Sequence, residues 1–566
     1  MSSQRVEPSG LWEAFPDPET ADNVRYNPDL ETLRELGAED EATTEFGSPA
    51  YVSEQRSRSA DRTKNLVDHD FESADWEAME TSLEIAAERD LVCLDRVVGR
   101  HPATSFLARL FVPTSHARIA LAWGNLLESA EAIEPTRAAG ADPDLAAGRE
   151  PDFQTLQLPE WDRDRRRRIR VLPDAGLTFV LGSDYTGEAK KSFLRLFMYE
   201  VKRQGGLGLH AGTKRLTIET DGEHEGGGGD GTVTDPGDGG TETDPGDGGI
   251  ETDPGDGGIE TDPGDGGIET VGQAFLGLSA TGKSTLTGHG CWLEAPEGAE
   301  MLQDDVAALL PDGQITGSEG RGLYIKTDGL DADEQPDLYR AATHESTVFE
   351  NVCVGEDGTV DFHDDTLTSN GRAVVQRHCL ASASEDVDLA EVDQVFFITR
   401  NPAMPPVARL SDEQAAVAFM LGESIQTSAG DPDAAGESIR VVGTNPFIVG
   451  PEGEEGNRFY DLVAANDVEC FVLNTGHVGP EGKAVVGVRE SVSILVGAAR
   501  GAIDWYHDEM LDLDLPASVP GIDVEAFYPP NHYDDYESEL ASLREERRAY
   551  LDAFDTLAEE IRAAVY

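Results

Sequence analysis

The sequence predicts an α/β protein. Its 566 residues fit roughly three to four ordinary domains, or equally two large α/β domains, each with a core of its own. Short apolar segments that favour strands, at residues 91–94, 178–181 and 395–398, alternate with segments of helical spacing. A glycine-rich segment, residues 277–285, directly follows the apolar run 274–276. A strand, a glycine-rich turn and a helix in this order are typical of the phosphate-binding units of α/β folds.

The glycine-rich segment fits the pattern G-x-x-x-x-G-K-[ST] at every fixed position. Its backbone N–H groups and the positive end of the following helix would point at one spot, where a polyphosphate can lie. Lys283 would reach the terminal phosphates, and the hydroxyl of Ser284 would bind the accompanying Mg²⁺. The candidate nucleotide-binding residues are Gly277, Ser279, Ala280, Thr281, Gly282, Lys283, Ser284 and Thr285.

Two adjacent carboxylates follow a short apolar strand about twenty residues after this loop. They are Asp304 and Asp305, in the segment Met301-Leu302-Gln303-Asp304-Asp305-Val306. A nucleotide site needs a second source of oxygen ligands for its metal ion. Because side chains alternate along a strand, the two carboxylates should point to opposite sides and do different work. One can bind a metal ion while the other orients water or a neighbouring group.

The charge of the chain excludes some classes of partner. Lys and Arg number 44 against 110 Asp and Glu, which gives a formal net charge of −66. This excludes unaided binding to nucleic acid or to an anionic membrane. Residues 221–269 hold only 16 of the acidic residues, so the whole surface is acidic. Such a surface resembles that of halophilic archaeal proteins, in which salt screens the repulsion between carboxylates. The basic run at residues 163–170 is interpreted as a solvated or internally paired surface.

Cysteine usage and the N-terminal segment indicate the compartment. The five cysteines are scattered and form no CxxC pair, so neither a disulfide framework nor a zinc site is indicated. Residues 1–18 are polar and acidic, and the chain has no run of 18 apolar residues. We expect a soluble cytoplasmic monomer that binds neither nucleic acid nor a membrane.

A nonapeptide, Thr-Asp-Pro-Gly-Asp-Gly-Gly-[Thr/Ile]-Glu, starts at Thr234, Thr243, Thr252 and Thr261. The units offer almost nothing apolar to bury, which predicts a flexible acidic loop that extends a hairpin turn. Their Asp and Gly content also resembles calcium-binding repeats, although the residue order differs. At the other end of the domain, the last 30 or so residues show helical spacing, which predicts one amphipathic helix that docks on the main body.

Several further motifs occur in a fixed order around the glycine-rich segment 277–285, which we call the phosphate loop. The segment Tyr185-Thr186-Gly187-Glu188-Ala189-Lys190-Lys191 comes first, and His210 follows it. The phosphate loop and Asp304-Asp305 come next, and Asn370-Gly371-Arg372, Met404-Pro405-Pro406 and Asn474-Thr475-Gly476 come last. Together these motifs resemble the ATP-dependent phosphoenolpyruvate carboxykinases, from about Arg58 to about Ala499. GTP-dependent relatives carry a cysteine in the phosphate loop, and this loop has none.

The resemblance implies the reaction of oxaloacetate and ATP to phosphoenolpyruvate, CO₂ and ADP in gluconeogenesis, with two divalent metal ions. The composition of residues 1–50, which are rich in Pro, Glu, Asp and Thr, predicts a partly ordered acidic leader. The resemblance implies a two-domain fold, with an N-terminal substrate-binding domain (51–206) and a C-terminal P-loop nucleotide-binding domain (207–566). The flexible repeat insert (221–269) would interrupt the last of these.

The resemblance also implies roles for single residues. Lys191, His210 and Asp305 would hold Mn²⁺, and Ser284 would bind the Mg²⁺ of the nucleotide. Lys191, Lys283, Asp304 and Arg372 would be catalytic. The substrate would be bound by Arg58, Tyr185, Lys191 and Arg372.

Two stretches depart from the pattern of the family. Arg58 stands in Arg58-Ser59-Ala60, where the family has Arg-Ser-Pro, and the spacing to Lys64 differs by one, so Arg56 remains an alternative. Near Ala484, the Arg and Thr that the family places beside adenine are not clearly kept, which leaves ATP or GTP open. Two other functions also remain open: a divergent P-loop kinase related to the HPr kinases, and a nucleotide-binding regulator without catalysis.

Overall fold

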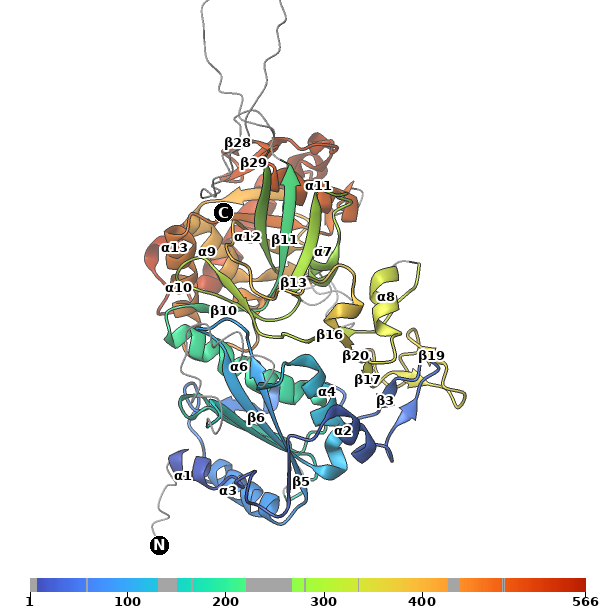
Figure 1. Ribbon diagram of the computed structural model, residues 1–566. Helices are drawn as coiled ribbons and strands as arrows, with labels where there is room; N and C mark the ends of the chain where they lie inside the picture. Colours follow the sequence, from blue (N-terminus) through green and yellow to red (C-terminus); the bar gives the residue numbers. More distant parts are fainter. Residues whose placement is uncertain are drawn as a thin grey trace, which may run out of the picture.

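The computed structural model has two bodies stacked end to end (Figure 1). It describes residues 8–57, 60–130, 150–163, 166–219, 267–278, 281–333, 335–425, 438–480, 482 and 484–566. Arg58, Ser279, Ala280 and the nonapeptide repeats up to residue 266 lie outside this set. The predicted α/β class is confirmed, because each body is a mixed sheet with helices on both faces.

The lower body in Figure 1 is built on a seven-stranded sheet in the order β1-β5-β6-β7-β9-β8-β4. Its strands are β1 (Val24–Tyr26), β4 (Thr63–Asn65), β5 (Leu91–Val98), β6 (Phe106–Pro113), β7 (Phe153–Leu158), β8 (Arg168–Leu172) and β9 (Leu177–Leu181). The sheet is mixed: β5 pairs antiparallel with β6, whereas β7 pairs parallel with both β6 and β9. The predicted strands at 91–94 and 178–181 are therefore confirmed.

Helices cover both faces of this sheet, and alternate residues of each strand face the two cores. The helices are α1 (Pro8–Glu13), α2 (Leu30–Leu36), α3 (Ser73–Ala87), α4 (Ala117–Leu126) and α6 (Thr186–Arg203). In β5, Val92 and Leu94 pack on the side of α2, α4 and α6, while Leu91 and Cys93 pack on the side of α1 and α3. This alternation follows from the two-residue period of a strand. Arg168 and Arg170, from the basic run, both donate to the buried carboxylate of Asp75, which confirms internal pairing for these two arginines.

The upper body is built on an eight-stranded sheet in the order β13-β11-β12-β21-β25-β22-β29-β28. Its strands are β11 (Ala211–Glu219), β12 (Ile268–Leu276), β13 (Gly298–Gln303), β21 (Gln394–Thr399), β22 (Val407–Leu410), β25 (Glu469–Asn474), β28 (Asp504–Asp508) and β29 (Leu513–Ser518). The three central strands β12, β21 and β25 are parallel. Residues 274–276, 395–398 and 470–473 of these strands are apolar and buried, because both faces of the sheet are covered there.

Two helical layers enclose these central strands. The helices are α7 (Lys283–Gly288), α9 (Asp412–Leu421), α10 (Glu452–Ala465), α11 (Val488–Ala499), α12 (Tyr536–Leu551) and α13 (Glu559–Ala563). Leu276 of β12 packs with the layer of α9, α10, α12 and α13, whereas Phe275 packs with α7 and α11. The phosphate loop connects the end of β12 to the start of the short helix α7. Because β12 lies inside the sheet, between β11 and β21, the loop begins at an inner strand.

A third sheet joins segments that are far apart in the sequence, in the order β16-β20-β17-β3-β2. Its strands are β2 (Ala42–Thr43), β3 (Pro49–Tyr51), β16 (Gly322–Lys326), β17 (Val348–Glu350) and β20 (Arg372–Gln376), and helix α8 (Pro336–Ala342) packs beside it. Parallel pairing of β3 with β17 ties residues 42–51 to the second half of the chain. These residues span the predicted boundary between the leader and the first domain.

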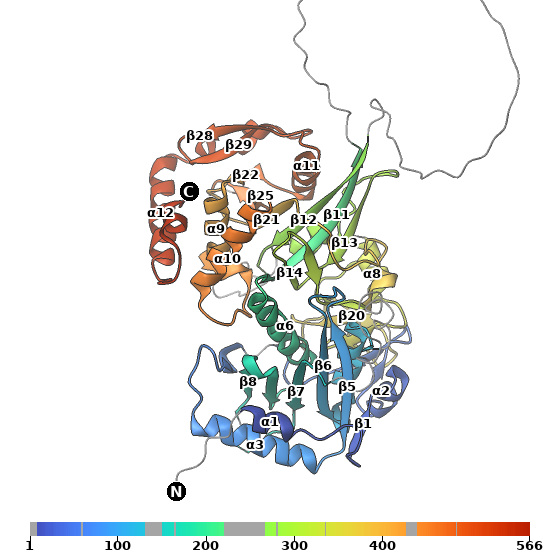
Figure 2. The ribbon, with the colours of Figure 1, turned by 60° about the vertical axis from the view of Figure 1, so that its left-hand side comes forward.

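Smaller sheets complete the fold. One has three strands, β10 (Leu207–Leu209), β14 (Ala307–Leu309) and β15 (Ile315–Gly317), and lies between the two bodies beside α6 (Figure 2). The two-stranded sheets are β18 (Cys353–Val354) with β19 (Val360–Asp361), β23 (Glu423–Ile425) with β24 (Ser438–Arg440), and β26 (His477–Val478) with β27 (Ala484–Val485). Within the described ranges, no helix is long and apolar enough to span a membrane.

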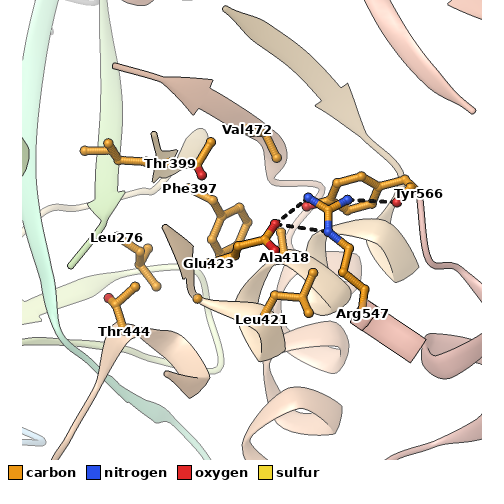
Figure 3. A pocket seen from close by; sticks show the side chains of 12 residues that line it. Leu276, Phe397, Thr399, Ala418, Leu421, Glu423, Thr444, Val472, Arg547 and Tyr566 are labelled. Atoms are coloured by element: carbon orange, nitrogen blue, oxygen red, sulfur yellow. Dashed lines mark hydrogen bonds and ion pairs between the residues drawn. The ribbon is translucent and has the colours of Figure 1, made fainter. Parts of the chain in front are cut away.

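The predicted single C-terminal helix is wrong, because the chain turns between two helices. The segment from Asp552 to Ala558 connects α12 to α13, and it places Leu551, Leu557 and Ile561 in one core. A buried ion pair fastens α12 to the main body: Arg547 donates to the carboxylate of Glu423 at 2.5 Å and to the backbone oxygen of Tyr566 at 2.8 Å (Figure 3). The predicted docking on the main body is confirmed.

The predicted hairpin that carries the repeats is confirmed by its two arms. Strands β11 and β12 pair antiparallel along their whole length, and Glu219 lies opposite Ile268 at the end where the insert begins. Ile268 and Glu269, which the sequence analysis assigns to the insert, belong to β12. The pairing brings the two ends of the insert together.

Because these ends meet, the insert can be replaced by a tight turn. Deleting residues 221–266 with Thr220→Asn leaves an Asn-Gly pair between Glu219 and Ile268, which suits a two-residue hairpin. We expect the melting temperature and the ATP affinity to stay close to those of the full chain. Thermal unfolding and calorimetric titration would check this. Loss of folding would show that the insert stabilises the domain.

Candidate active site

His210 and Asp305 form the centre of the site. His210 lies between β10 and β11, and Asp305 lies in the bend after β13. Nε2 of His210 is 3.0 Å from Oδ1 of Asp305, and Nδ1 is 2.6 Å from the carbonyl oxygen of Thr444. The carbonyl can only accept, so Nδ1 carries the proton in this contact. Burial, and then the ammonium of Lys283, lower the pKa of His210, which favours the neutral ring.

A neutral His210 presents a lone pair at Nε2 to the carboxylate of Asp305. Two acceptors at 3.0 Å call for a cation between them, and imidazole nitrogen and carboxylate oxygen are both metal ligands. The hydrogen bond to Thr444 fixes the ring in the orientation that a metal-binding histidine requires. These two residues therefore fit a divalent metal ion. Among the described residues, no third His, Cys, Asp or Glu completes a set of three, so a further ligand must be of another type.

Lys190 pairs with the same carboxylate from the other side. Its ammonium lies 2.9 Å from Oδ2 of Asp305 and 2.7 Å from Oε2 of Glu319, and its side chain is only 2% exposed. Burial alone would lower the pKa of Lys190, but the two carboxylates raise it. Burial alone would likewise raise the pKa of Asp305, yet the ammonium of Lys190 holds it well below its usual value. Asp305 is thus ionised and fixed on both oxygens.

Lys191 lies next to Lys190 on α6 and reaches the region of His210. Its ammonium stands 5.6 Å from the centre of the Phe447 ring, and the edge of the His210 ring meets the same phenyl ring at 6.1 Å between centres. The structure thus places Lys191 and His210 around one aromatic side chain. Ligation of a metal ion by Lys191 stays a prediction.

The phosphate loop leads into α7 through Gly282, which has a φ of +98° that favours glycine. A side-chain carbon at Gly277 would stand 2.6 Å from the hydroxyl of Thr281, so this glycine is needed for space. The hydroxyl of Thr475 donates to the carbonyl of Thr281 at 2.6 Å and fastens the loop to the end of β25. Ser284 and Thr285 are exposed on the first turn of α7.

Lys283 is buried and its ammonium has no hydrogen-bond partner among the described residues. Burial lowers its pKa, and Asp305 and Asp304 oppose this only in part. Oδ1 of Asp304 is likewise buried and unpartnered within the described ranges. The two adjacent carboxylates therefore differ in their contacts: Asp305 lies against His210 and Lys190, whereas Oδ1 of Asp304 has no partner among the described residues.

Arg372 and Tyr185 lie on the side of the lower body. The guanidinium of Arg372 stands 5.4 Å from the ring centre of Tyr324, and the ammonium of Lys190 stands 5.4 Å from the same ring. Asn370 accepts from Arg372 and donates to the hydroxyl of Tyr185 at 3.2 Å. This chain of contacts connects the pair of His210 and Asp305 to the predicted substrate side.

Two local constraints explain the motif around Tyr185. The Tyr185 ring packs so closely over Gly187 that a side-chain carbon there would clash with it. The neighbouring Asp184 carboxylate accepts from Arg118 at 2.7 Å, and from the backbone N–H groups of Glu54 and Gln55. Asp184 thereby anchors the segment that precedes Arg56.

The guanidinium of Arg56 donates to the carbonyl oxygens of Leu367 at 2.5 Å and Ser53 at 3.3 Å. Its own carbonyl accepts from Asn370. Arg58, which the sequence favours, lies outside the described residues, and so do Ser279 and Ala280 of the phosphate loop.

Comparison with known proteins identifies the family. A sequence profile described as phosphoenolpyruvate carboxykinase matches residues 34–228 and 265–525. The chain belongs to the ATP-dependent phosphoenolpyruvate carboxykinase family. A relative from Aeropyrum pernix named phosphoenolpyruvate carboxykinase (ATP) is 30% identical over 95% of this chain and 96% of its own length. A relative of the same name from Mesorhizobium japonicum is 26% identical over 81% of this chain and 75% of its own.

The extent of these matches bears on the alternatives. The relative from Salinibacter ruber, named phosphoenolpyruvate carboxykinase (ATP) 1, is 25% identical over 73% of this chain and 69% of its own. Both the lower and the upper body are matched, so neither a kinase related to the HPr kinases nor a regulator without catalysis is favoured. The profile does not match residues 229–264, which hold most of the repeats.

Sequence reasoning missed some residues of this carboxykinase site. Lys190 and Glu319 pair only because α6 and the segment after β15 meet in space. Lys214 of β11 is fully buried behind the phosphate loop, where it donates to the carbonyls of Leu286 and His289 at the end of α7. Burial lowers the pKa of Lys214. Arg215 stands next to Lys214 in β11, so the sequence gives no signal that Lys214 is the buried charge, and its acceptors could not have been named.

Substitution of two buried lysines of the site, Lys283 and Lys190, should have opposite effects on the free energy of unfolding. Lys283→Met removes a buried charge without a partner, so the ligand-free protein should gain on the order of 1 kcal/mol while ATP binding is lost. Lys190→Met leaves Asp305 and Glu319 without their cation and should cost about 3 kcal/mol. Denaturant unfolding of both variants, with calorimetric ATP titration, checks this pair. Destabilisation of equal size in both would contradict the contrast.

Proposed function

We propose that this chain converts oxaloacetate and ATP to phosphoenolpyruvate, CO₂ and ADP. One observation carries the proposal: the phosphate loop lies beside the pair of His210 and Asp305. The ammonium of Lys283, which has no partner among the described residues, is close enough to affect both groups electrostatically. In a chain of net charge −66, Lys190, Lys191, Lys283 and Arg372 gather around this point. Such a cluster suits a reaction in which an enolate and a phosphoryl group carry negative charge.

The bonds change in two steps. The bond between the enolate carbon and the departing carboxylate breaks, CO₂ leaves, and its electron pair forms the enolate of pyruvate. The enolate oxygen then attacks the γ-phosphorus of ATP, and ADP leaves with the electrons of the broken P–O bond. In this assignment Arg372 orients the substrate towards the γ-phosphoryl group, and Lys283 neutralises that group as it transfers.

Two divalent metal ions fit the side chains present. We assign Mn²⁺ to His210 and Asp305 with Lys191 as a further ligand, and Mg²⁺ to Ser284 with the nucleotide phosphates. When bound, the ions would neutralise the enolate and the phosphates. Lys191 must lose its proton to be a ligand, and the nearby cation favours this loss. The unpartnered oxygen of Asp304 would hold a water molecule or a neighbouring group.

We assign substrate binding to Tyr185, Arg372, Lys191 and Arg58. Because the guanidinium of Arg56 is already engaged by two carbonyl oxygens, Arg58 is the better choice for the substrate carboxylate. The hydroxyl of Tyr185 is positioned by Asn370 and would bind the substrate or CO₂.

Further properties are proposed on the sequence. We propose residues 51–206 as the substrate domain and residues 207–566 as the P-loop nucleotide domain. We also propose a cytoplasmic monomer that works towards gluconeogenesis at high salt, with adenine bound near the hairpin of β26 and β27, beside Ala484.

An activity assay tests the proposal directly. Purified protein in molar KCl, given oxaloacetate, ATP and Mn²⁺, should form phosphoenolpyruvate, and GTP in its place should give much less. Removal of divalent ions with a chelator should abolish the product. No phosphoenolpyruvate with any nucleotide or metal ion would refute the proposed function.

Two variants test the role of the metal site in turnover. His210→Ala and Lys191→Ala should lose Mn²⁺-dependent turnover by roughly 100-fold or more, because positioned ligands and electrostatic groups contribute on this scale. Both should still bind ATP, since the phosphate loop is unchanged. A variant with full turnover would exclude that residue from the site.

A further inference from the structure

Arg400 is a partly buried arginine that has no counterion among the described residues. It follows β21 directly, and its Nε atom is buried. Among the described residues, its guanidinium takes part in no hydrogen bond or ion pair, which is unusual in a chain with 110 acidic residues. Burial lowers the pKa of Arg400, and no neighbouring carboxylate opposes this. A cation in such surroundings costs free energy unless an anion joins it.

The position of Arg400 is next to the phosphate loop. Strand β21 runs parallel to β12 with Phe397 opposite Leu276, so Arg400 comes off the same edge of the sheet as the loop. The carbonyl of Thr399 accepts from the N–H of Thr475 at 2.9 Å, and the hydroxyl of Thr475 holds Thr281. Two hydrogen bonds made by Thr475 thus connect Thr399, the residue before Arg400, to Thr281 of the loop. In open α/β sheets, ligands bind at this edge, outside the carboxyl ends of the strands.

The local packing leaves room for the side chain of Arg400. A side-chain carbon at Gly476 would stand 3.2 Å from Cβ and 3.3 Å from Cγ of Arg400. The absence of a side chain at Gly476 lets Arg400 pass close to the backbone at the end of β25. This glycine thus has a packing role beside a charged group.

The nearby buried carboxylate is already used. Glu423 lines the same small cavity as Thr399, the residue before Arg400 (Figure 3). Its carboxylate is paired with Arg547 at 2.5 Å and with Arg440 at 2.6 Å. These arginines hold its pKa below the ordinary value although burial would raise it. Glu423 therefore does not supply the missing anion.

We propose that Arg400 binds phosphate oxygens of the nucleotide, in addition to Lys283. The inference rests on the proposed function for the identity of the nucleotide and adds a phosphate-binding residue to that site. A guanidinium suits this task because its fork of N–H donors matches phosphate oxygens. Oxaloacetate is the less suitable anion, since its proposed ligands Tyr185 and Arg372 lie on the side of the lower body.

Binding measured without oxaloacetate tests this role. Arg400→Gln should weaken ATP and ADP by roughly 10- to 100-fold, the scale of a hydrogen bond to a charged group. Adenosine, measured by displacement of a fluorescent ATP analogue, should bind as it does to the unchanged protein. Arg400→Lys keeps the charge but loses the fork, so it should bind ATP with intermediate affinity. Arg409→Gln, which changes an arginine of β22 paired with Asp514, should leave all three affinities unchanged.

The possible outcomes separate this role from others. ATP affinity within twofold of the original in Arg400→Gln would overturn the inference, and so would an equal loss for adenosine, which would indicate stacking on the base. Should Arg400→Gln fail to fold, Arg400→Lys decides: unchanged ATP affinity would contradict a bidentate phosphate contact. If the unchanged protein makes phosphoenolpyruvate while Arg400→Gln binds ATP normally, only this inference fails. If no product forms but ATP binding depends on Arg400, only the proposed reaction fails.

Discussion

The contact between His210 and Asp305 is the constraint on which the rest of the site depends. It joins the segment between β10 and β11 to the bend after β13, at a distance of 3.0 Å between two groups that both accept. Thr444 fixes the outer nitrogen of the ring, and Lys190 fixes the second carboxylate oxygen. The fold thereby holds two metal ligands in place before a metal ion arrives. Helix α6, which supplies Lys190, lies at the junction of the two bodies (Figure 2).

The charged groups of the molecule fall into two kinds. Pairs such as Arg547 with Glu423, or Arg170 with Asp75, are complete and hold the fold together. Around the phosphate loop, by contrast, Lys283, Asp304 and Arg400 keep buried polar atoms without partners among the described residues. Such groups cost stability in the free protein and gain partners only when anions and metal ions bind. In this acidic chain, Lys283 and Arg400 are thus cationic groups that can bind anionic ligands.

Sequence alone could predict the parts of the site that depend on local order. The spacing of the phosphate loop, and Asp304-Asp305 at a strand end, follow from motif and period. Lys190, Lys214 and Arg400 could not be predicted, because their roles depend on which buried groups meet in space. Residues 42–51 show the same limit, since their pairing with β17 is a long-range contact. The C-terminal helical spacing concealed a turn at residues 552–558 because both helices bury apolar residues in one core.

The location of manganese in crystals tests the central claim most directly, namely that His210 and Asp305 are two ligands of one ion. Crystals grown with Mn²⁺ and ATP would be measured at the manganese absorption edge. The account predicts an anomalous peak between Nε2 of His210 and Oδ1 of Asp305, with the ammonium nitrogen of Lys191 as a further neighbour. A peak bound by Asp304 alone, with His210 still in direct contact with Asp305, would contradict it.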